Sequence, residues 1–368
     1  MTVKTIHAHS CPVVRIGKHA KHPNADTLRI WNGPQGPVIF REGQFNEGDL
    51  AAFVVLDSLV DVSRPEFSFL KDGEKAQVRV RPVRLRGIPS VGLLVACPPG
   101  LSEGDDAGVA LGVAKWEPPQ THSFGTSSNA ETPPGDVVGL SEYDVENVWN
   151  IDNFSEFGVK EGNEPLTHNS VIGWDLTEKI HGCNARFTFS DGRWHCGSKR
   201  RWVKHDGSNV WSVALNQILA GPHAEVFKDI AEHHVIFGEV FGKVQDLHYG
   251  IPNGVSFLAF DLYSKSNNKF LDSDTIFGEY FFDLPSLCVT EIQYVRGKLS
   301  DAVEVARDQI AKNGKTRIEK ADNIIEGIVI RPRFFDYYVN ARRGPARLLV
   351  KVINPAYLQR QNGTEFTE

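Results

Sequence analysis

A run of proline and small polar residues divides this chain and limits what it can fold into. Residues 118–135 read PPQTHSFGTSSNAETPPG, with a proline pair near each end. Such a segment cannot bury enough apolar surface to order itself, so it indicates an exposed linker. We therefore expect a domain at residues 1–118, a linker at 119–136 and a second domain at 137–368. A chain of 368 residues is long enough for two domains.

The part before the linker consists of short apolar segments separated by turns. Its candidate strands are residues 13–16, 28–31, 38–40, 50–56, 78–81 and 92–95. Five or six strands in roughly 115 residues indicate an all-β barrel or sandwich.

The part after the linker has mixed character. Residues 187–189, 235–237, 328–330 and 348–353 are candidate strands. Residues 210–220 and 301–312 have helical spacing, the second with an apolar stripe of Val303, Val305, Ala306, Ile310 and Ala311. Strands and helices in this order predict an α+β domain.

Charge and cysteine content narrow the class of protein. The net charge is −6, yet residues 64–88 hold seven basic and three acidic residues. Basic charge is therefore local, which suits a groove for a polyanion.

The five cysteines include no CxxC pair, which is typical of free thiols in a reducing cytoplasm. With no export signal and no apolar run of about 18 residues, we expect a cytoplasmic protein without a membrane partner.

Five short motifs follow one another in the second part. They are EKIHG at 178–182, FGEV at 237–240, FLAFD at 257–261, EGIVIR at 326–331 and LLVK at 348–351. This succession resembles nucleotidyltransferase motifs I, III, IIIa, IV and V of ATP-dependent RNA ligases, DNA ligases and mRNA capping enzymes. Any single motif would be weak, whereas the ordered set is specific.

Four further features narrow the resemblance. His181 within motif I, and the segment YDVEN at 143–147, are similar to RNA ligase 2-type enzymes. HPNADTL at 22–28 resembles the entry to tRNA-binding OB folds, and residues 66–70 and 83–93 resemble the amino-terminal OB module of one RNA ligase group. The whole chain except the linker thus resembles RNA ligase family 5. The resemblance implies an OB barrel followed by an adenylylation domain that joins 5′-phosphate to 3′-hydroxyl ends.

The resemblance assigns Lys179 as the nucleophile that takes AMP from ATP, a role that suits an amine with a lowered pKa. It places Glu239 and Glu326 beside Mg²⁺ or Mn²⁺, in contact with the water shell of the metal. The resemblance also implies that five further residues contact the nucleotide: Glu178, Arg186, Phe260, Arg331 and Lys351. Phe260 would stack on adenine, with a core aromatic as the alternative.

The chain departs from the family pattern in two motifs. Lys351 stands alone in motif V, where many ligases have two lysines, and Arg331 stands in motif IV where relatives often have lysine. Arginine can still bind phosphate. Its planar guanidinium group differs from the ammonium group of lysine, so the replacement is not neutral.

Basic residues outside these motifs are candidates for nucleic-acid contacts. Lys199 and Arg200 fall in SKRR at 198–201, which matches motif Ia; a solvated turn is the alternative. In the OB module, four arginines would bind a nicked duplex of RNA or an RNA/DNA hybrid: Arg79, Arg81, Arg84 and Arg86. The alternative is that these side chains only keep the surface charged and soluble. Alternation along a strand would place Arg79 and Arg81 on one face.

We expect a monomeric RNA ligase acting in RNA repair. A DNA ligase, a capping-type nucleotidyltransferase and a non-catalytic RNA- or tRNA-binding OB protein remain as alternatives. Transfer of labelled AMP rather than GMP to the protein would separate ligation from capping. Comparing RNA with DNA 3′-hydroxyl strands would identify a DNA ligase.

Overall fold

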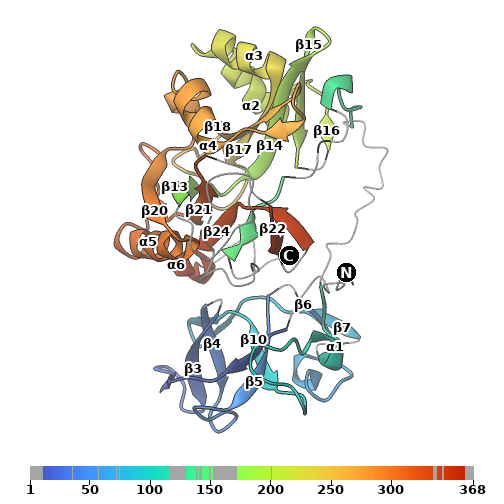
Figure 1. The fold of residues 1–368 in the computed structure, drawn as a ribbon, viewed down its shortest axis with the longest axis vertical. Helices are drawn as coiled ribbons and strands as arrows, with labels where there is room; N and C mark the ends of the chain where they lie inside the picture. The colour runs from blue at the N-terminus through green and yellow to red at the C-terminus, as the bar shows by residue number, and fades with distance from the viewer. Residues whose placement is uncertain are drawn as a thin grey trace. The chain divides into compact units, whose positions relative to one another are not determined.

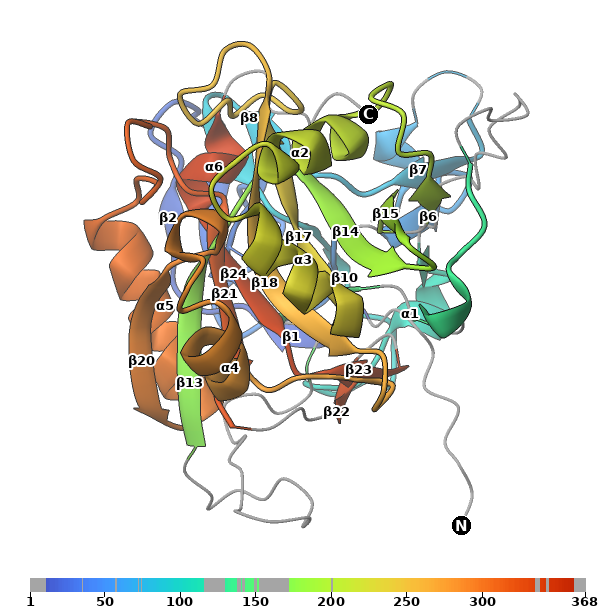
Figure 2. The ribbon, with the colours of Figure 1, turned by 90° about the horizontal axis from the view of Figure 1, so that it is seen from above.

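The chain folds into two compact units, one formed mainly by residues up to 122 and the other mainly by the residues that follow. The computed structural model (Figures 1 and 2) describes residues 11–34, 36–56, 58–71, 73, 75–115, 130–137, 140, 143–148, 151, 172–199, 201–334, 338–341 and 344–360. No helix in these residues is long and apolar enough to cross a membrane.

The first unit is built almost entirely from short strands. They are β1 (Val13–Arg15), β2 (His19–Lys21), β3 (Leu28–Gly33), β4 (Gly36–Arg41), β5 (Leu50–Val54), β6 (Ser58–Asp61), β7 (Gln77–Arg79), β8 (Val83–Leu85), β9 (Ile88–Ser90), β10 (Leu93–Ala96) and β11 (Ala114–Lys115), with a 3₁₀ turn η1 (Ser68–Leu70) and a helix α1 (Gly108–Leu111). The expected all-β character is confirmed. Within the described residues the pairing gives four small sheets, β1-β5-β10, β2-β3-β4, β11-β6-β7 and β8-β9, rather than one closed ladder.

Strand β5 organises the interior of this unit. Alternate side chains of a strand point to opposite faces. Ala52 and Val54 accordingly pack into one apolar cluster with Val13 and Val60, whereas Ala51 and Phe53 pack into another with Trp31. One central strand therefore serves two small cores.

A five-stranded sheet forms one layer of the second unit. Its order is β12 (Glu146–Asn147), β24 (Val350–Ile353), β21 (Gly327–Pro332), β13 (Ile172–Lys179) and β20 (Glu291–Gly297). Helix α5 (Leu299–Lys312) buries Leu299, Ala302, Val303, Ala306 and Ile310 against this sheet. Spacings of three and four residues place these side chains on one helical face. The predicted stripe was wrong at Ala311, which is exposed because it lies beyond that face.

A six-stranded sheet forms the other layer. Its order is β16 (Trp202–Val203), β15 (Arg193–Ser198), β14 (Cys183–Ser190), β17 (His234–Gly242), β18 (Val255–Ser264) and β19 (Lys269–Phe270). Helices α2 (Val210–Leu219) and α3 (Ala224–His233) lie over its β14-β17-β18 part (Figures 1 and 2). The expected helix at 210–220 is confirmed as α2, whereas α3 was not predicted.

The remaining described elements of the chain are short. They are η2 (Gly135–Val137), α4 (Ser273–Thr275), a π-helical turn η5 (Ile276–Tyr280), η6 (Pro285–Leu287), the pair β22 (Tyr338–Ala341) and β23 (Gly344–Arg347), and α6 (Pro355–Gln359).

The carboxyl-terminal part of the expected linker packs on the second unit. Ala130 forms a bridge with Val203, and Val137 is buried in an apolar cluster with Trp202. Asp136 accepts a hydrogen bond from Ser190 and pairs with Lys265. The described residues 130–136 therefore contact the second unit although most of them are exposed, and the linker at 119–136 stays a prediction.

Motif I joins the two sheets. Lys179 is the last residue of β13 in the five-stranded sheet, and Cys183 begins β14 in the six-stranded sheet. Only Ile180, His181 and Gly182 connect them, so the nucleophile candidate lies where the two layers meet.

Gly182 is required by the close approach of β17. A Cβ at this position would lie 2.2 Å from the carbonyl oxygen of Val240 and 3.0 Å from Cγ of Glu239. The atoms that exclude a side chain at this position belong to β17.

We expect Gly182→Ala to destabilise the protein by roughly 1–3 kcal/mol, because β17 must shift to admit the new methyl group. The measurement is the free energy of unfolding in urea. Gly278→Ala is the matched control, since no atom lies within 4 Å of its hypothetical Cβ. Equal stability of Gly182→Ala and the control would show that the approach of β17 is not constraining.

Candidate active site

A pocket between the two sheets collects most of the site residues predicted in the second unit. It is lined by Tyr143, Asp144, Val145, Thr177, Glu178, Lys179, Ile180, Asn184, Lys199, Glu239, Phe260, Val289, Val329, Arg331 and Lys351. All five motifs contribute to this lining, and Glu326, which does not line the pocket itself, contacts Lys179 directly. Residues up to 208 positions apart in the sequence therefore meet in one place.

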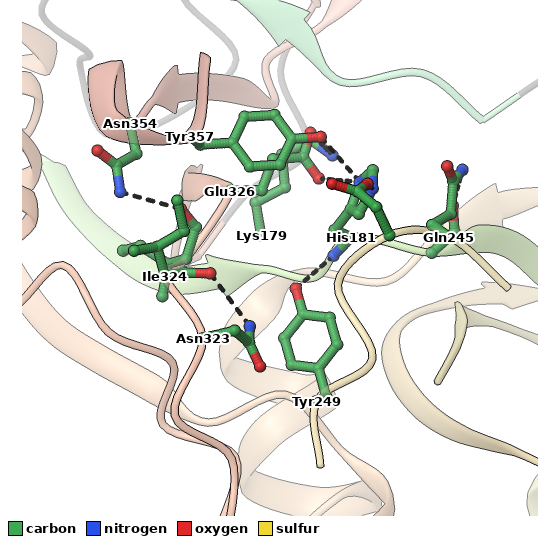
Figure 3. A network of polar contacts seen from close by, with 12 residues as sticks. Lys179, His181, Gln245, Tyr249, Asn323, Ile324, Glu326, Asn354 and Tyr357 are labelled. Carbon is green, nitrogen blue, oxygen red and sulfur yellow. Dashed lines mark hydrogen bonds and ion pairs between the residues drawn. The ribbon is translucent and has the colours of Figure 1, made fainter. Parts of the chain in front are cut away.

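Lys179 is held by an ion pair at the end of β13. Its Nζ lies 2.7 Å from Oε1 of Glu326, which precedes β21 (Figure 3). The two side chains are 23% and 10% exposed, so the pair is largely removed from water while the amine still reaches the pocket. Adjacent strands bring them together, because Lys179 pairs with Gly327 in the β13-β21 ladder.

The two predicted metal-site glutamates have opposite electrostatic environments. Burial raises the pKa of the Glu239 carboxyl to about 8; Lys179 partly offsets this effect, and the negative charge of Glu326 adds to it. Burial also acts to raise the pKa of Glu326, but Lys179 and the hydrogen bonds from His181 and Lys179 outweigh it and hold that pKa at about 2. Glu326 is therefore ionised, whereas Glu239 is poised to lose or gain its proton near neutral pH.

Two further cations face the same pocket. Burial, and then the neighbouring charge of Lys179, lower the pKa of Lys351 on β24. Arg331 on β21 is 3% exposed, and its Nε and Nη1 make no hydrogen bond within the described residues. Buried donors of this kind favour an anionic ligand that could satisfy them.

An aromatic wall closes one side of the pocket. Phe260 lies 5.0 Å from Tyr143, centroid to centroid, and Tyr143 lies 5.2 Å from Phe237 in a stacked arrangement. The Tyr143 hydroxyl donates a hydrogen bond of 2.9 Å to Asp261, which also accepts from Arg347 at 2.6 Å. Phe260 lines the pocket and also packs against two apolar clusters, so its stacking on a base stays a prediction.

Sequence reasoning missed the contributions of Tyr143 and Asp261. Asp261 is completely buried, and it lies 3.6 Å from Nη1 of Arg331 in addition to its hydrogen bonds. A carboxylate within the apolar run FLAFDL could have indicated this role, because a buried charge needs partners.

Glu178 presents an unsatisfied oxygen to the pocket. Its Oε2 accepts a hydrogen bond of 2.8 Å from the backbone N–H of Arg317, whereas Oε1 is buried and makes no hydrogen bond within the described residues. Burial raises the pKa of this carboxyl. A ligand with a hydrogen-bond donor would satisfy Oε1.

The remaining predicted contacts in this unit differ in position. Lys199 lines the pocket and forms an ion pair with Asp144, 3.0 Å away. Arg186 is buried on β14 outside the pocket lining, with its guanidinium 4.4 Å from the ring centre of Trp202. Burial lowers the pKa of Arg186 to about 10. Arg200 lies outside the described residues.

The four arginines predicted to grip a duplex belong to the first unit. Strand β7 ends at Arg79, so Arg81 lies beyond it and the expected shared strand face was wrong. Arg84 is on β8, and Arg86 has a positive φ of 48° in the turn to β9. Hydrogen bonds from His22 to the Leu85 carbonyl and from Asn24 to the Arg86 carbonyl hold this hairpin.

The site offers carboxylates but no complete metal cage. In the part of the chain that the structure describes, no group of three or more histidine, cysteine or acidic side chains could hold an ion. Glu239 and Glu326 lie beside Lys179, and hard cations accept oxygen ligands while keeping waters. The residues therefore fit a Mg²⁺ or Mn²⁺ ion held through its water shell, with substrate phosphates completing the coordination.

Comparison with protein families identifies both parts of the chain. Residues 173–353 match a model described as RNA ligase, and residues 11–97 match one described as an OB-fold domain. The second domain belongs to the RNA ligase family. It contains all five motifs, and the OB-fold domain precedes it. A search of curated proteins finds no match.

Solved structures of Naegleria gruberi RNA ligase share this fold. A lysine-to-alanine mutant with ATP and Mn has a TM-score of 0.63 at 18% identity, covering 95% of this chain and 98% of that one. The same enzyme with pyrophosphate has a TM-score of 0.61 at 18% identity, covering 97% and 98%. A lysine-to-methionine mutant with AMP and Mn has a TM-score of 0.62, also at 18% identity, covering 95% and 98%. The expected order of an OB-fold domain and a nucleotidyltransferase domain is confirmed.

The raised pKa of Glu239 makes stability depend on pH. A carboxyl with a pKa of about 8 when folded, against about 4.5 when unfolded, binds more protons in the folded state. The contribution of Glu239 to the free energy of unfolding is therefore fully present below pH 4.5, and it is lost as the pH rises toward 8. In metal-free buffer we expect Glu239→Gln to stabilise the ligase by on the order of 1–4 kcal/mol at pH 8, with little change at pH 4.5.

The measurement is urea unfolding across this pH range. Glu319→Gln is the control, because Glu319 is exposed. If the free energy of unfolding of Glu239→Gln equals that of the wild type at every pH, the pKa of Glu239 is not raised by burial.

Proposed function

We propose that this chain is an ATP-dependent RNA ligase of the RNA ligase family 5 type, which seals 5′-phosphate to 3′-hydroxyl ends in RNA repair. Its substrate would be a nick in duplex RNA or an RNA/DNA hybrid, with RNA on the 3′-hydroxyl side. The strongest support is the position of Lys179, 2.7 Å from Glu326 and at the edge of a pocket lined by the other motifs. It would act as a cytoplasmic monomer, with working domains at 1–118 and 137–368.

In the first step, Nζ of Lys179 attacks the α-phosphorus of ATP. A P–N bond forms, the bond to the β-phosphate oxygen breaks, and pyrophosphate leaves. Arg331 and Lys351 face the pocket and would neutralise the triphosphate, which is where catalysis of phosphoryl transfer gains most. Mg²⁺ or Mn²⁺ held through water by Glu239 and Glu326 would supply further charge neutralisation at the α-phosphate.

In the later steps AMP serves as an activated leaving group. The 5′-phosphate oxygen of the nick attacks the lysyl-bound AMP, Lys179 leaves, and the end becomes adenylylated. The 3′-hydroxyl then attacks that end, a phosphodiester forms and AMP departs. Phe260, Tyr143 and Glu178 line the pocket, where they would hold the nucleotide.

The structural neighbours support these ligands. The Naegleria gruberi ligase has been solved with ATP and Mn, with AMP and Mn, and with pyrophosphate. These are the substrate, the transferred group and the leaving group that the proposed first step requires. At 18% identity the likeness establishes the fold, so the chemistry must be tested on this chain.

Lys179→Ala should abolish transfer of labelled AMP to the protein, because no other amine occupies that position. The variant should still join a nick whose 5′ end is already adenylylated, at a reduced rate. Lys312→Ala is the control, since Lys312 is exposed on α5, where it pairs with Asp308. Labelled AMP retained on Lys179→Ala would overturn the nucleophile assignment.

The OB-fold domain should act on the nick rather than on ATP. We expect Arg84→Ala/Arg86→Ala to leave lysyl-AMP formation nearly unchanged but to slow sealing of 5′-phosphate nicks. The salt dependence of duplex binding should lose about one unit of slope per phosphate contact. Arg41→Ala, exposed on β4, is the control.

Deleting residues 1–118 should exaggerate the same difference between the two steps. Full-strength sealing by the truncated protein at saturating ATP would mean that the OB-fold domain does not position the nick. An equal collapse of AMP transfer and sealing would instead place its role in the nucleotide step.

A further inference from the structure

Four side chains contact the second and third residues after the nucleophile, and Figure 3 labels Gln245, Tyr249 and Tyr357 among them. We call them the motif I clamp: Gln245, Asp246, Tyr249 and Tyr357. None belongs to a motif recognised in the sequence. All four contact His181 or Gly182, whose backbone connects the two sheets.

The loop after β17 supplies three of these contacts. The Tyr249 hydroxyl accepts a hydrogen bond of 2.7 Å from the backbone N–H of His181, and Gln245 donates one of 3.0 Å to the Gly182 carbonyl. Oδ1 of Asp246 lies 2.7 Å from Nε2 of His181. A carboxylate can only accept, so Nε2 carries the hydrogen and the ring has one orientation.

The fourth contact comes from the end of the ligase domain. The Tyr357 hydroxyl lies 2.9 Å from Nδ1 of His181, and the two rings meet edge to face at 5.3 Å. Asn354 anchors this segment: its side chain donates to the Ile325 carbonyl, and its backbone N–H donates to the Glu326 carbonyl. The turn that carries Tyr357 is therefore tied to the backbone of Glu326.

His181 lies against the partner of the nucleophile. Its Nδ1 is 3.5 Å from Oε2 of Glu326, whose Oε1 is 2.7 Å from Nζ of Lys179. Glu326 is thus held between the lysine and the imidazole. Rotation of the His181 ring would remove one of these contacts and release the carboxylate to move.

We propose that the motif I clamp is a positioning device for AMP transfer, an inference that rests on the proposed function. It holds His181 against Glu326, and through Glu326 it directs the Lys179 amine into the pocket. Neither Asp246 nor Tyr357 belongs to the pocket lining. Loosening the clamp slows the attack of Lys179 without weakening the binding of ATP.

The decisive experiment measures single-turnover lysyl-AMP formation by the full chain at saturating labelled ATP. We expect Tyr357→Phe and Asp246→Ala each to slow this rate about tenfold to a hundredfold, because small misplacements of a nucleophile are costly. The KM for ATP should stay within about twofold. Asp246→Asn keeps an accepting oxygen and should recover most of the rate. Tyr294→Phe, with a partly exposed hydroxyl on β20, is the control.

A second background separates positioning from general stabilisation. In His181→Ala, neither Tyr357→Phe nor Asp246→Ala should lower the rate further, since both act through the imidazole. Additive losses would overturn the proposal, as would unchanged single-variant rates or losses explained by a raised KM for ATP. Tyr357→Phe removes a single oxygen atom, so we expect the variant to fold. Its thermal unfolding curve checks that it is folded at the assay temperature.

Failure of the clamp and failure of the proposed function give different results. Wild-type protein that takes up no AMP would refute the function and the inference together. Wild-type protein that forms lysyl-AMP, with clamp variants as fast as Tyr294→Phe, would refute the clamp alone.

Discussion

The ion pair between Lys179 and Glu326 is the interaction around which the second domain is arranged. Both residues lie at the same end of neighbouring strands, because Lys179 pairs with Gly327 in the β13-β21 ladder. Breaking a buried pair leaves one charge uncompensated, which is far more costly than losing an exposed pair. The junction of the two sheets, the neighbouring Glu239 and the clamp on His181 all adjoin this one contact.

The pair also divides two similar glutamates into different roles. Glu326 keeps its charge because Lys179 is in contact, whereas Glu239 is buried beside that negative charge and its pKa rises to about 8. A bound cation or the phosphates of a substrate would change this balance at once. The resting site is therefore electrostatically incomplete, as expected for a site that assembles its charges when substrate arrives.

Local elements were predictable wherever one periodicity dominated. Helix α5 shows the expected 3.6-residue spacing, and β5 shows the alternation that serves two cores. Helix α3 was missed although it buries Phe227, Ile230 and Ala231 on one face, because its three apolar anchors are few. Composition predicted a linker at residues 119–136, and it could not predict that the described residues 130–136 contact β16 and Lys265.

The sequence alone determined the chemistry that this chain can attempt. The order of its motifs identified Lys179, Glu239, Glu326, Phe260, Arg331 and Lys351, and these residues meet in the structure because each motif lies on a strand of one of two adjoining sheets. Only the tertiary structure decided how His181 is held. Asp246 and Tyr357 are 65 and 176 residues away from it. Hydrogen bonds between such distant positions depend on how the sheets pack, and no local pattern of residues encodes that packing.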